Sequence, residues 1–376
     1  MTAAAPAFLE KVPLGRFLAP MLGGIALALG AQFLVGALVS QDILPAYYQK
    51  VLIDICINVI LAVSLNLVNG FTGQFSIGHA GFMAVGGYTA GFITYYGSMV
   101  LWQDVGTHGG FLGSGEWLFA AACVIGGLVA AFFGFLVGLP SLRLRGDYLA
   151  IVTLGFGEIV RVLLQQTGEV LQTPEDLKAT PLLFPVHRGD QWVDPLVMDV
   201  GGSLGFTGIP FYTSLFWVVL FVTAILIVSV RLKTSSYGRA LLSIRENEIA
   251  AEAMGVNTTK YKVRAFILAA FFAGIAGGLF GHEVGTTLNP RELGFQKSFD
   301  IVIMVVLGGM GSISGSALAA VLLTILPELL RSFSEYRMIA YALTLVVMMI
   351  VRPQGLFGIR EIWEIRWRDL LRRRPV

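Results

Sequence analysis

The sequence predicts an all-α polytopic membrane protein with about ten transmembrane helices, where eight to eleven are compatible with the pattern. Hydrophobic residues make up 56% of the 376 residues and charged residues only 13%, which is about half the share in a soluble domain. The mean hydropathy is +0.76. Apolar runs of about 20 residues, the length that crosses a bilayer, recur along the chain. We therefore expect a single transmembrane domain over residues 1–376.

The expected membrane spans follow from these apolar runs. The first run begins after Lys11 and Arg16 and has no small-residue cleavage site, so it predicts a helix and not a removed signal peptide. Glycine and serine interrupt the chain between residues 308 and 315, so the region 299–333 contains either two short spans or one re-entrant pair. The expected spans are 17–39, 51–69, 76–97, 117–139, 148–166, 213–230, 263–283, 299–312, 314–333 and 338–351.

Lysine and arginine predict the orientation, because they accumulate in cytoplasmic loops. They are dense in residues 231–262, in the short loop with Arg143 and Arg145, and in the basic tail 359–376. The loop 167–212 is rich in aspartate and glutamate instead, and we expect it to be external and to form a small cap or hairpin. Ten crossings with both termini in the cytoplasm satisfy all of these assignments. The net charge of +2 gives no argument for nucleic-acid binding.

The stretch from Gly238 to Gly255 predicts short amphipathic helices on the cytoplasmic side. Apolar and charged residues alternate there at helical spacing, and Gly255 is suited to end a helix. Such a loop between two spans can dock into a groove of a soluble partner. The alternative is a helix that lies on lipid headgroups, and its three glutamates fit that role poorly.

These residues also resemble a known family. The segment Glu248–Gly255, Glu-Ile-Ala-Ala-Glu-Ala-Met-Gly, resembles the coupling-loop motif of ABC importer permeases. More closely, several stretches between about residues 60 and 358 resemble the permeases of high-affinity branched-chain amino-acid importers, and most of all the LivM-type subunit. These stretches are Gly70–Phe82, Gly146–Phe156, Ala265–Gly277, Leu307–Ser312 and Arg352–Gly358.

The resemblance implies the partners and the transport mechanism. Permeases of this family pair with a second, LivH-like permease subunit, bind two cytoplasmic ATPase subunits and receive substrate from a periplasmic amino-acid-binding protein. They import branched-chain (hydrophobic) amino acids across the bacterial cytoplasmic (inner) membrane by alternating access. Contact with the ATPase is expected from six residues of the coupling loop, namely Arg245, Glu246, Glu248, Ala251, Glu252 and Gly255.

The chain itself is not expected to be an enzyme or to bind a cofactor. The sequence contains no G-x-x-x-x-G-K-[ST] phosphate loop. ATP and Mg²⁺ are therefore expected in the partner ATPase subunits.

Two glycine-rich interruptions are expected to face the translocation pathway. Paired breaks in the two halves of a transporter are a common pointer to its substrate route, and both breaks here contain a G-x-x-S-I pattern. Tight helix packing by small residues is the competing interpretation. His79 fits either a proton relay or a local backbone hydrogen bond. The candidate pathway residues are Asn66, Gly73, Ser76, His79, Gly308, Gly309, Gly311 and Ser312.

Other polar and reactive residues are expected to be structural. Glu158 and Arg161 are three residues apart in a span and can pair on one helix face. His282 and Glu283 lie near an external helix end, where we expect them to be solvated or interfacial. Cys56 and Cys123 lie in apolar runs and are expected to be packing residues, since free cysteine behaves as a small hydrophobe.

Three other functions compete with the leading one. A urea or short-amide ABC permease would have a similar sequence, and pathway residues that separate the substrates are not identifiable from one chain. An ion-coupled secondary amino-acid transporter should carry acidic residues deep in its spans, where Glu158 is nearly alone. A membrane enzyme would need a cluster of catalytic or metal-binding side chains, and four scattered histidines do not provide one.

Overall fold

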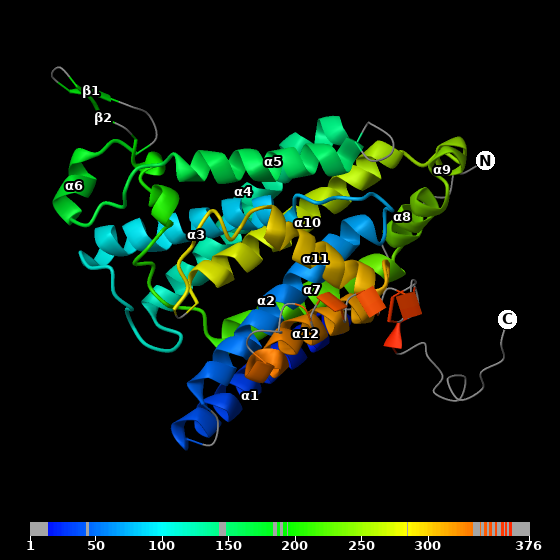
Figure 1. Ribbon diagram of the computed structural model, residues 1–376, viewed down its shortest axis with the longest axis horizontal. Coiled ribbons are helices and arrows are strands. Elements are labelled where there is room, and N and C mark those ends of the chain that lie inside the picture. The colour runs from blue at the N-terminus through cyan, green and yellow to red at the C-terminus, as the bar shows by residue number, and fades with distance from the viewer. Residues whose placement is uncertain are drawn as a thin grey trace, which may run out of the picture.

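The computed structural model describes residues 14–42, 45–142, 148–182, 186–188, 191–193, 195–283 and 285–333, with isolated residues between 339 and 362. Long helices form the body of this part of the chain (Figure 1). The helices are α1 (Leu14–Ser40), α2 (Ala46–Asn69), α3 (His79–Trp102), α4 (Ser114–Ser141), α5 (Tyr148–Gln165), α6 (Pro174–Ala179), α7 (Leu215–Thr234), α8 (Ser236–Glu246), α9 (Glu248–Ala253), α10 (Thr258–Gly281), α11 (Phe295–Gly308) and α12 (Ile313–Leu329).

The all-α membrane fold predicted from the sequence is confirmed. Each of the first nine expected spans coincides with a helix of the structure. Within the described residues, six of these helices are long and apolar enough to cross a membrane, namely α1, α2, α4, α5, α7 and α10. The tenth expected span, 338–351, lies mostly outside the described residues, as do the loop with Arg143 and Arg145 and most of the tail 359–376.

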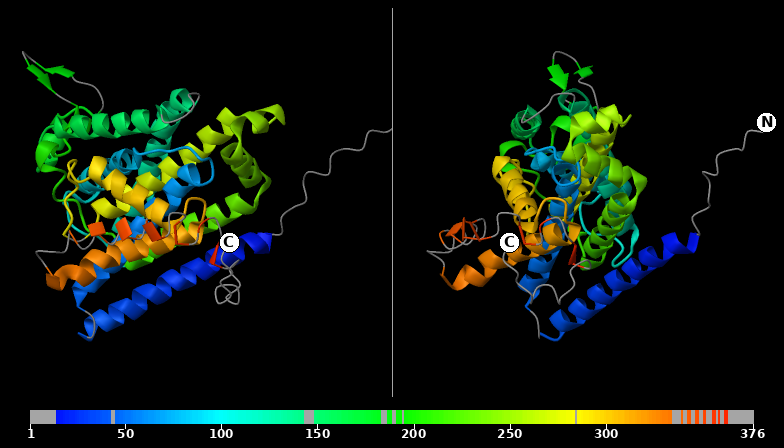
Figure 2. Two further views of the ribbon diagram at one scale, coloured as in Figure 1. Left: turned by 45° about the vertical axis from the view of Figure 1, so that its right-hand side comes forward. Right: turned by 90° about the vertical axis from the view of Figure 1, so that its right-hand side faces the viewer.

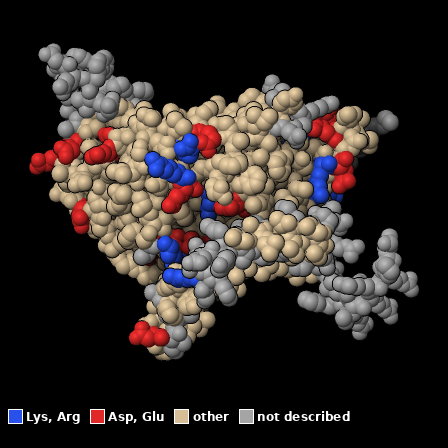
Figure 3. All heavy atoms as spheres, viewed as in Figure 1, with Lys and Arg blue, Asp and Glu red and all other residues tan. Residues whose placement is uncertain are grey.

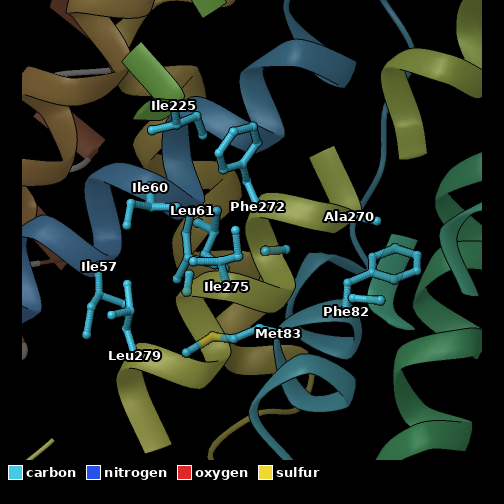
Figure 4. Close-up of a cluster of buried hydrophobic side chains, with 14 of the residues drawn as sticks. Ile57, Ile60, Leu61, Phe82, Met83, Ile225, Ala270, Phe272, Ile275 and Leu279 are labelled. Atoms are coloured by element: carbon cyan, nitrogen blue, oxygen red, sulfur yellow. The ribbon is translucent and has the colours of Figure 1, made fainter. Parts of the chain in front are cut away.

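Helices α3, α4 and α10 form the centre of the bundle because small residues let their backbones approach closely. A Cβ atom on Gly277 of α10 would stand only 1.9 Å from the carbonyl oxygen of Met83 in α3. A Cβ on Gly126 of α4 would likewise stand 2.5 Å from the carbonyl oxygen of Gly86. Next to these contacts, larger aliphatic side chains of α2 and α10 interlock, among them Ile57, Ile60, Leu61, Ile275 and Leu279 (Figure 4).

The two ends of the bundle carry different structures (Figures 1 and 2). At one end, α8 and α9 fold as a pair beside the start of α10. At the other end, residues 167–212 form α6, two 3₁₀ turns and an antiparallel hairpin of β1 (Val186–Arg188) and β2 (Gln191–Val193), in which Val186 pairs with Val193. The expected cap or hairpin is therefore present. Helix α1 lies along the outside of the bundle (Figure 2).

The region 299–333 consists of two short helices. Helix α11 ends at Gly308 and α12 begins at Ile313, with a tight turn between them. A Cβ on Gly308 would meet the backbone of Gly315 at 2.5 Å, so the two helices touch through glycine at this turn. The sequence located the interruption correctly.

The expectation that His282 and Glu283 are solvated was wrong. Both side chains are almost completely buried. His282 Nδ1 lies 2.7 Å from the carbonyl oxygen of Gly278, and its Nε2 lies 2.6 Å from the hydroxyl of Thr94. The loop before α7 covers the end of α10, because Thr213 donates from its backbone amide to the carbonyl oxygen of His282.

Candidate functional site

Helices α8 and α9 form the predicted amphipathic loop, and local capping explains their boundaries. The hydroxyl of Ser235 accepts a hydrogen bond from the amide of Gly238 at 3.1 Å, which caps α8. The side chain of Asn247 accepts from the amide of Ala250 at 3.0 Å, which ends α8 and begins α9. Gly255 follows α9 with φ +87°, in the left-handed conformation that glycine adopts at helix ends.

One face of this helix pair is buried and the other is open to solvent. Leu241 and Ile244 of α8 pack against the bundle. On the opposite side, the side chains of Ile249 and Met254 are 65% and 85% exposed. Glu246 and Gly255 are exposed beside them. Apolar side chains on a short helix pair that stands out from the end of the bundle are what a docking contact with another protein requires.

Three of the residues predicted to contact the ATPase are engaged within the chain. Glu248 forms an ion pair with Lys262 of α10, with Oε1 2.6 Å from Nζ. Glu252 accepts a hydrogen bond of 2.7 Å from the hydroxyl of Thr258. Ala251 is buried. These contacts fix the angle between α9 and α10.

Arg245 connects α8 with both glycine-rich breaks. Its Nη1 donates to the carbonyl oxygen of Gly70 at 2.8 Å and to that of Met310 at 3.3 Å. Gly70 is the first residue after α2, and Met310 lies in the turn between α11 and α12. A Cβ on Gly311 would stand 2.4 Å from this guanidinium nitrogen, so the turn needs glycine to let the arginine approach. Gly73, with φ +69°, lies exposed beside the stem of Arg245.

Asn66 joins the two breaks to each other. Its side-chain oxygen accepts from the amide of Gly311 at 2.8 Å, and its side-chain nitrogen donates to the carbonyl oxygen of Ser312 at 3.0 Å. The side chain is almost completely buried. A buried amide whose donor and acceptor are both used by backbone holds that backbone in one register. The last turn of α2 and the α11–α12 turn are therefore one hydrogen-bonded unit.

The sequence analysis missed Lys233 and Glu361, which complete this unit. Lys233, in the last turn of α7, donates to the carbonyl oxygen of Gly311 at 2.9 Å and pairs with the carboxylate of Glu361 at 2.5 Å. That carboxylate also accepts from the backbone amides of Ile313 and Ser314 at 3.0 Å each, so it caps α12 from the basic tail. The only signal for it was an acidic residue within a basic segment.

The surroundings of Glu361 favour its ionised form. Burial opposes ionisation, but the hydrogen bonds from Lys233, Ser314 and two backbone amides outweigh it and hold the pKa of this carboxyl below its ordinary value. The positive end of the α12 dipole acts in the same direction. The surroundings of Glu361 therefore stabilise its carboxylate form.

The other predicted pathway residues are packed into the same region. Ser76 donates from its amide to the side-chain oxygen of Asn69 at 3.1 Å, which closes the 70–78 loop. His79 is buried with Nε2 2.7 Å from the hydroxyl of Ser64. Gly309, at φ +101°, would drive a Cβ to 2.4 Å from the carbonyl oxygen of Gly358. In the described part of the chain, no group of His, Cys, Asp and Glu is arranged to hold a metal ion.

Comparison with known proteins places these features in a family. Residues 47–352 match the family described as "Branched-chain amino acid transport system / permease component". The chain belongs to this permease family. The match contains all but the first residue of α2 and the helices α3 to α12, and with them both breaks and the α8–α9 pair.

Individual relatives carry the same description. The high-affinity branched-chain amino acid transport system permease protein LivM of Escherichia coli K12 is 37% identical over 93% of this chain and 81% of the relative. LivH of the same organism is 26% identical over 81% of this chain and 92% of the relative. BraD of Pseudomonas aeruginosa is 25% identical over 81% and 93%. The chain is thus of the LivM type. No solved structure matches it.

Proposed function

We propose that this protein is a permease subunit of an ATP-binding-cassette importer that moves branched-chain amino acids across the bacterial inner membrane by alternating access. The proposal is supported by family membership and by the names of the LivM, LivH and BraD relatives. A second, LivH-like permease would complete the pathway. Two ATPase subunits and a periplasmic binding protein would supply the energy and the substrate.

The observation that carries the coupling part of the proposal is the position of Arg245. It lies in the helix pair that presents Ile249 and Met254 outward, and it holds the backbone of both breaks. A partner that pushes on α8 and α9 would therefore move the ends of α2 and α11 directly. Most polar groups of the predicted pathway residues are already hydrogen-bonded within the chain. These residues would therefore transmit motion from the ATPase to the substrate route.

The same geometry suggests an orientation. The end with α8 and α9 would face the cytoplasm, together with both termini, and the end with α6 and the β1–β2 hairpin would face the periplasm. The loop 167–212 would then be available to the binding protein. The basic stretch 231–262 lies at the proposed cytoplasmic end, as the distribution of positive charge in membrane proteins requires.

Reconstitution tests the proposal. The chain is co-expressed with candidate LivH-like and ATPase subunits, purified through a tag on this chain, and placed in liposomes that contain ATP, with the binding protein and radiolabelled leucine outside. We expect leucine uptake that requires ATP. Uptake of urea but not of leucine would show that the proposed substrate is wrong and would leave the proposed mechanism unchanged. Uptake driven by an ion gradient, without a co-purifying ATPase, would overturn the proposal.

A further inference from the structure

A layer of charged and polar side chains, buried or half-buried, lies at the end of the bundle opposite to α8 and α9. Lys50, Asp54 and Asn58 follow one another at intervals of four along one face of α2. Lys297, in the first turn of α11, donates from Nζ to the side-chain oxygen of Asn58 at 3.2 Å. The side-chain nitrogen of Asn58 in turn donates to the hydroxyl of Thr324 in α12 at 3.0 Å. The layer therefore connects α2, α11 and α12.

Glu283 enters this layer from the end of α10. Its side chain is only 1% exposed, and within the described residues neither carboxylate oxygen has a hydrogen-bond donor of normal geometry. The acidic side chain beside it is Asp54, so two carboxyl groups meet in this layer. Lys50 and Lys297 act on it through their charge, and Lys50 Nζ lies 3.9 Å from where a Cβ would stand on Gly285.

A buried carboxyl group next to a second acid costs folding free energy, so the pair needs an explanation. Ionisable groups inside a membrane protein commonly mark a substrate or ion route. The space-filling view shows charged side chains in a band over α5, the segment before α11 and the outer ends of α2 and α12, with further charged groups at the two ends near α6 and near α8 and α9 (Figure 3). Lipid would be a poor neighbour for such a band, whereas a polar pathway would accommodate it.

The next layer inward is aliphatic. Ile57 lies one turn deeper than Asp54 on α2, and Leu279 lies one turn deeper than Glu283 on α10. Both are fully buried and lie close together (Figure 4). On the charged side, Lys297 Nζ stands 5.8 Å from the centre of the Phe280 ring. Two acids, two bases and an apolar floor complement a small zwitterion with an apolar side chain.

We propose that this layer is a binding site for an α-amino acid on the outer half of the pathway. Glu283 and Asp54 would receive the ammonium group, and Lys297 and Lys50 the carboxylate. The aliphatic side chain would rest on the layer of Ile57 and Leu279, which is closed in this structure and would part during the transport cycle. The inference rests on the proposed function and adds to it the residues that recognise the substrate.

The experiment pairs variants with ligands that lack one charge. Binding of radiolabelled leucine to the purified permease assembly is measured without binding protein, with competition by 4-methylpentanoate, which lacks the ammonium, and by 3-methylbutylamine, which lacks the carboxylate. Glu283→Gln should lower the affinity for leucine at least about tenfold and leave the affinity for 4-methylpentanoate unchanged. Lys297→Gln should lower the affinities for leucine and 4-methylpentanoate and leave the affinity for 3-methylbutylamine unchanged. The control Glu175→Gln, at an exposed acid of α6, should leave the binding of all three ligands unchanged.

Two results would overturn the inference. The first is that the wild-type protein binds no leucine. The second is that a variant lowers the affinities for all three ligands equally. If Glu283→Gln fails to assemble, Asp54→Asn replaces it, with the same expected pattern. Uptake by the wild-type assembly separates this inference from the proposed function. If the assembly takes up leucine but the variants lack the ligand-specific pattern, only the proposed binding site is refuted. If the assembly transports no amino acid, the proposed transport function is refuted.

Discussion

The guanidinium of Arg245 donates a hydrogen bond of 2.8 Å to the carbonyl oxygen of Gly70, 175 positions away in the sequence. This contact joins a helix outside the membrane bundle to the end of a helix within it. A charged donor on a backbone carbonyl is about twice as strong as a neutral one. Motion of α8 therefore reaches α2 through a bond and not through loose loop backbone.

Removing this contact should uncouple transport from the ATPase. Arg245→Ala leaves the buried face of α8 intact, so we expect the ATPase to co-purify as before. Leucine uptake should fall at least about tenfold, because losing a hydrogen bond to a charged group costs about 1.5–3 kcal/mol. ATP hydrolysis and uptake are measured in the same liposomes, and their ratio reports the coupling.

Arg239→Ala is the matched control for that experiment. Arg239 lies on the same helix and is exposed, and among the described residues its side-chain hydrogen bonds reach only Ser236 and Thr234 nearby. The control should keep normal uptake. Equal losses in both variants would contradict a specific role for Arg245, since they would reflect general damage to α8.

The exposed apolar residues of α9 should decide partner binding. Met254→Asp places a charge in the surface that we propose the ATPase covers, and burying an unpaired charge is costly. We expect recovery of the ATPase with tagged permease to fall at least about tenfold, while the permease keeps its thermal stability. Leu204→Asp, at an exposed leucine of the other end of the bundle, should leave recovery unchanged. Normal recovery with Met254→Asp would remove this surface from the interface.

Local sequence pattern predicted most of what depends on neighbouring residues. The alternation of Leu241 and Ile244 with charged residues predicted α8, and Gly255 predicted the end of the pair. The two glycine-rich breaks were located for the same reason, because loss of apolar periodicity is visible in a short window. The predicted pathway function of the breaks remains a proposal.

Contacts between distant segments were not predictable in this way. Asn66 and Gly311 are 245 positions apart, and the local sequence of neither segment indicates that it contacts the other. Glu361 was hidden in a basic tail that was expected only to lie on the cytoplasmic side. Glu283 was expected to be solvated or interfacial because it lies near a helix end, but burial there depends on the loop that folds over it, here the residues before α7.

Close packing of α3 on α10 should make Gly277 intolerant of any side chain. In Gly277→Ala, the new Cβ would stand 1.9 Å from the carbonyl oxygen of Met83, so the helices must separate. Overpacking of this kind costs about 1–3 kcal/mol. Gly155→Ala is the control, because nothing lies within 4 Å of its Cβ position on α5. Thermal unfolding in detergent should show a lower Tm for the first variant only; equal Tm values would refute the packing described for these helices.

Glu361 should stabilise the protein in a pH-dependent way. Its folded-state pKa lies below the ordinary value of 4.5, so its contribution is complete above that value and is lost as the pH falls through the folded-state pKa. Glu361→Gln removes the charge that pairs with Lys233 and should cost about 1.5–3 kcal/mol at neutral pH. The difference in Tm between wild type and variant should be constant from about pH 8 to about pH 6 and should shrink below about pH 4.5. Glu246→Gln, at an exposed acid of α8, is the control and should show no such trend. A difference that grows as the medium becomes acidic would mean that Glu361 is protonated in the folded state, and the cap on α12 would need another explanation.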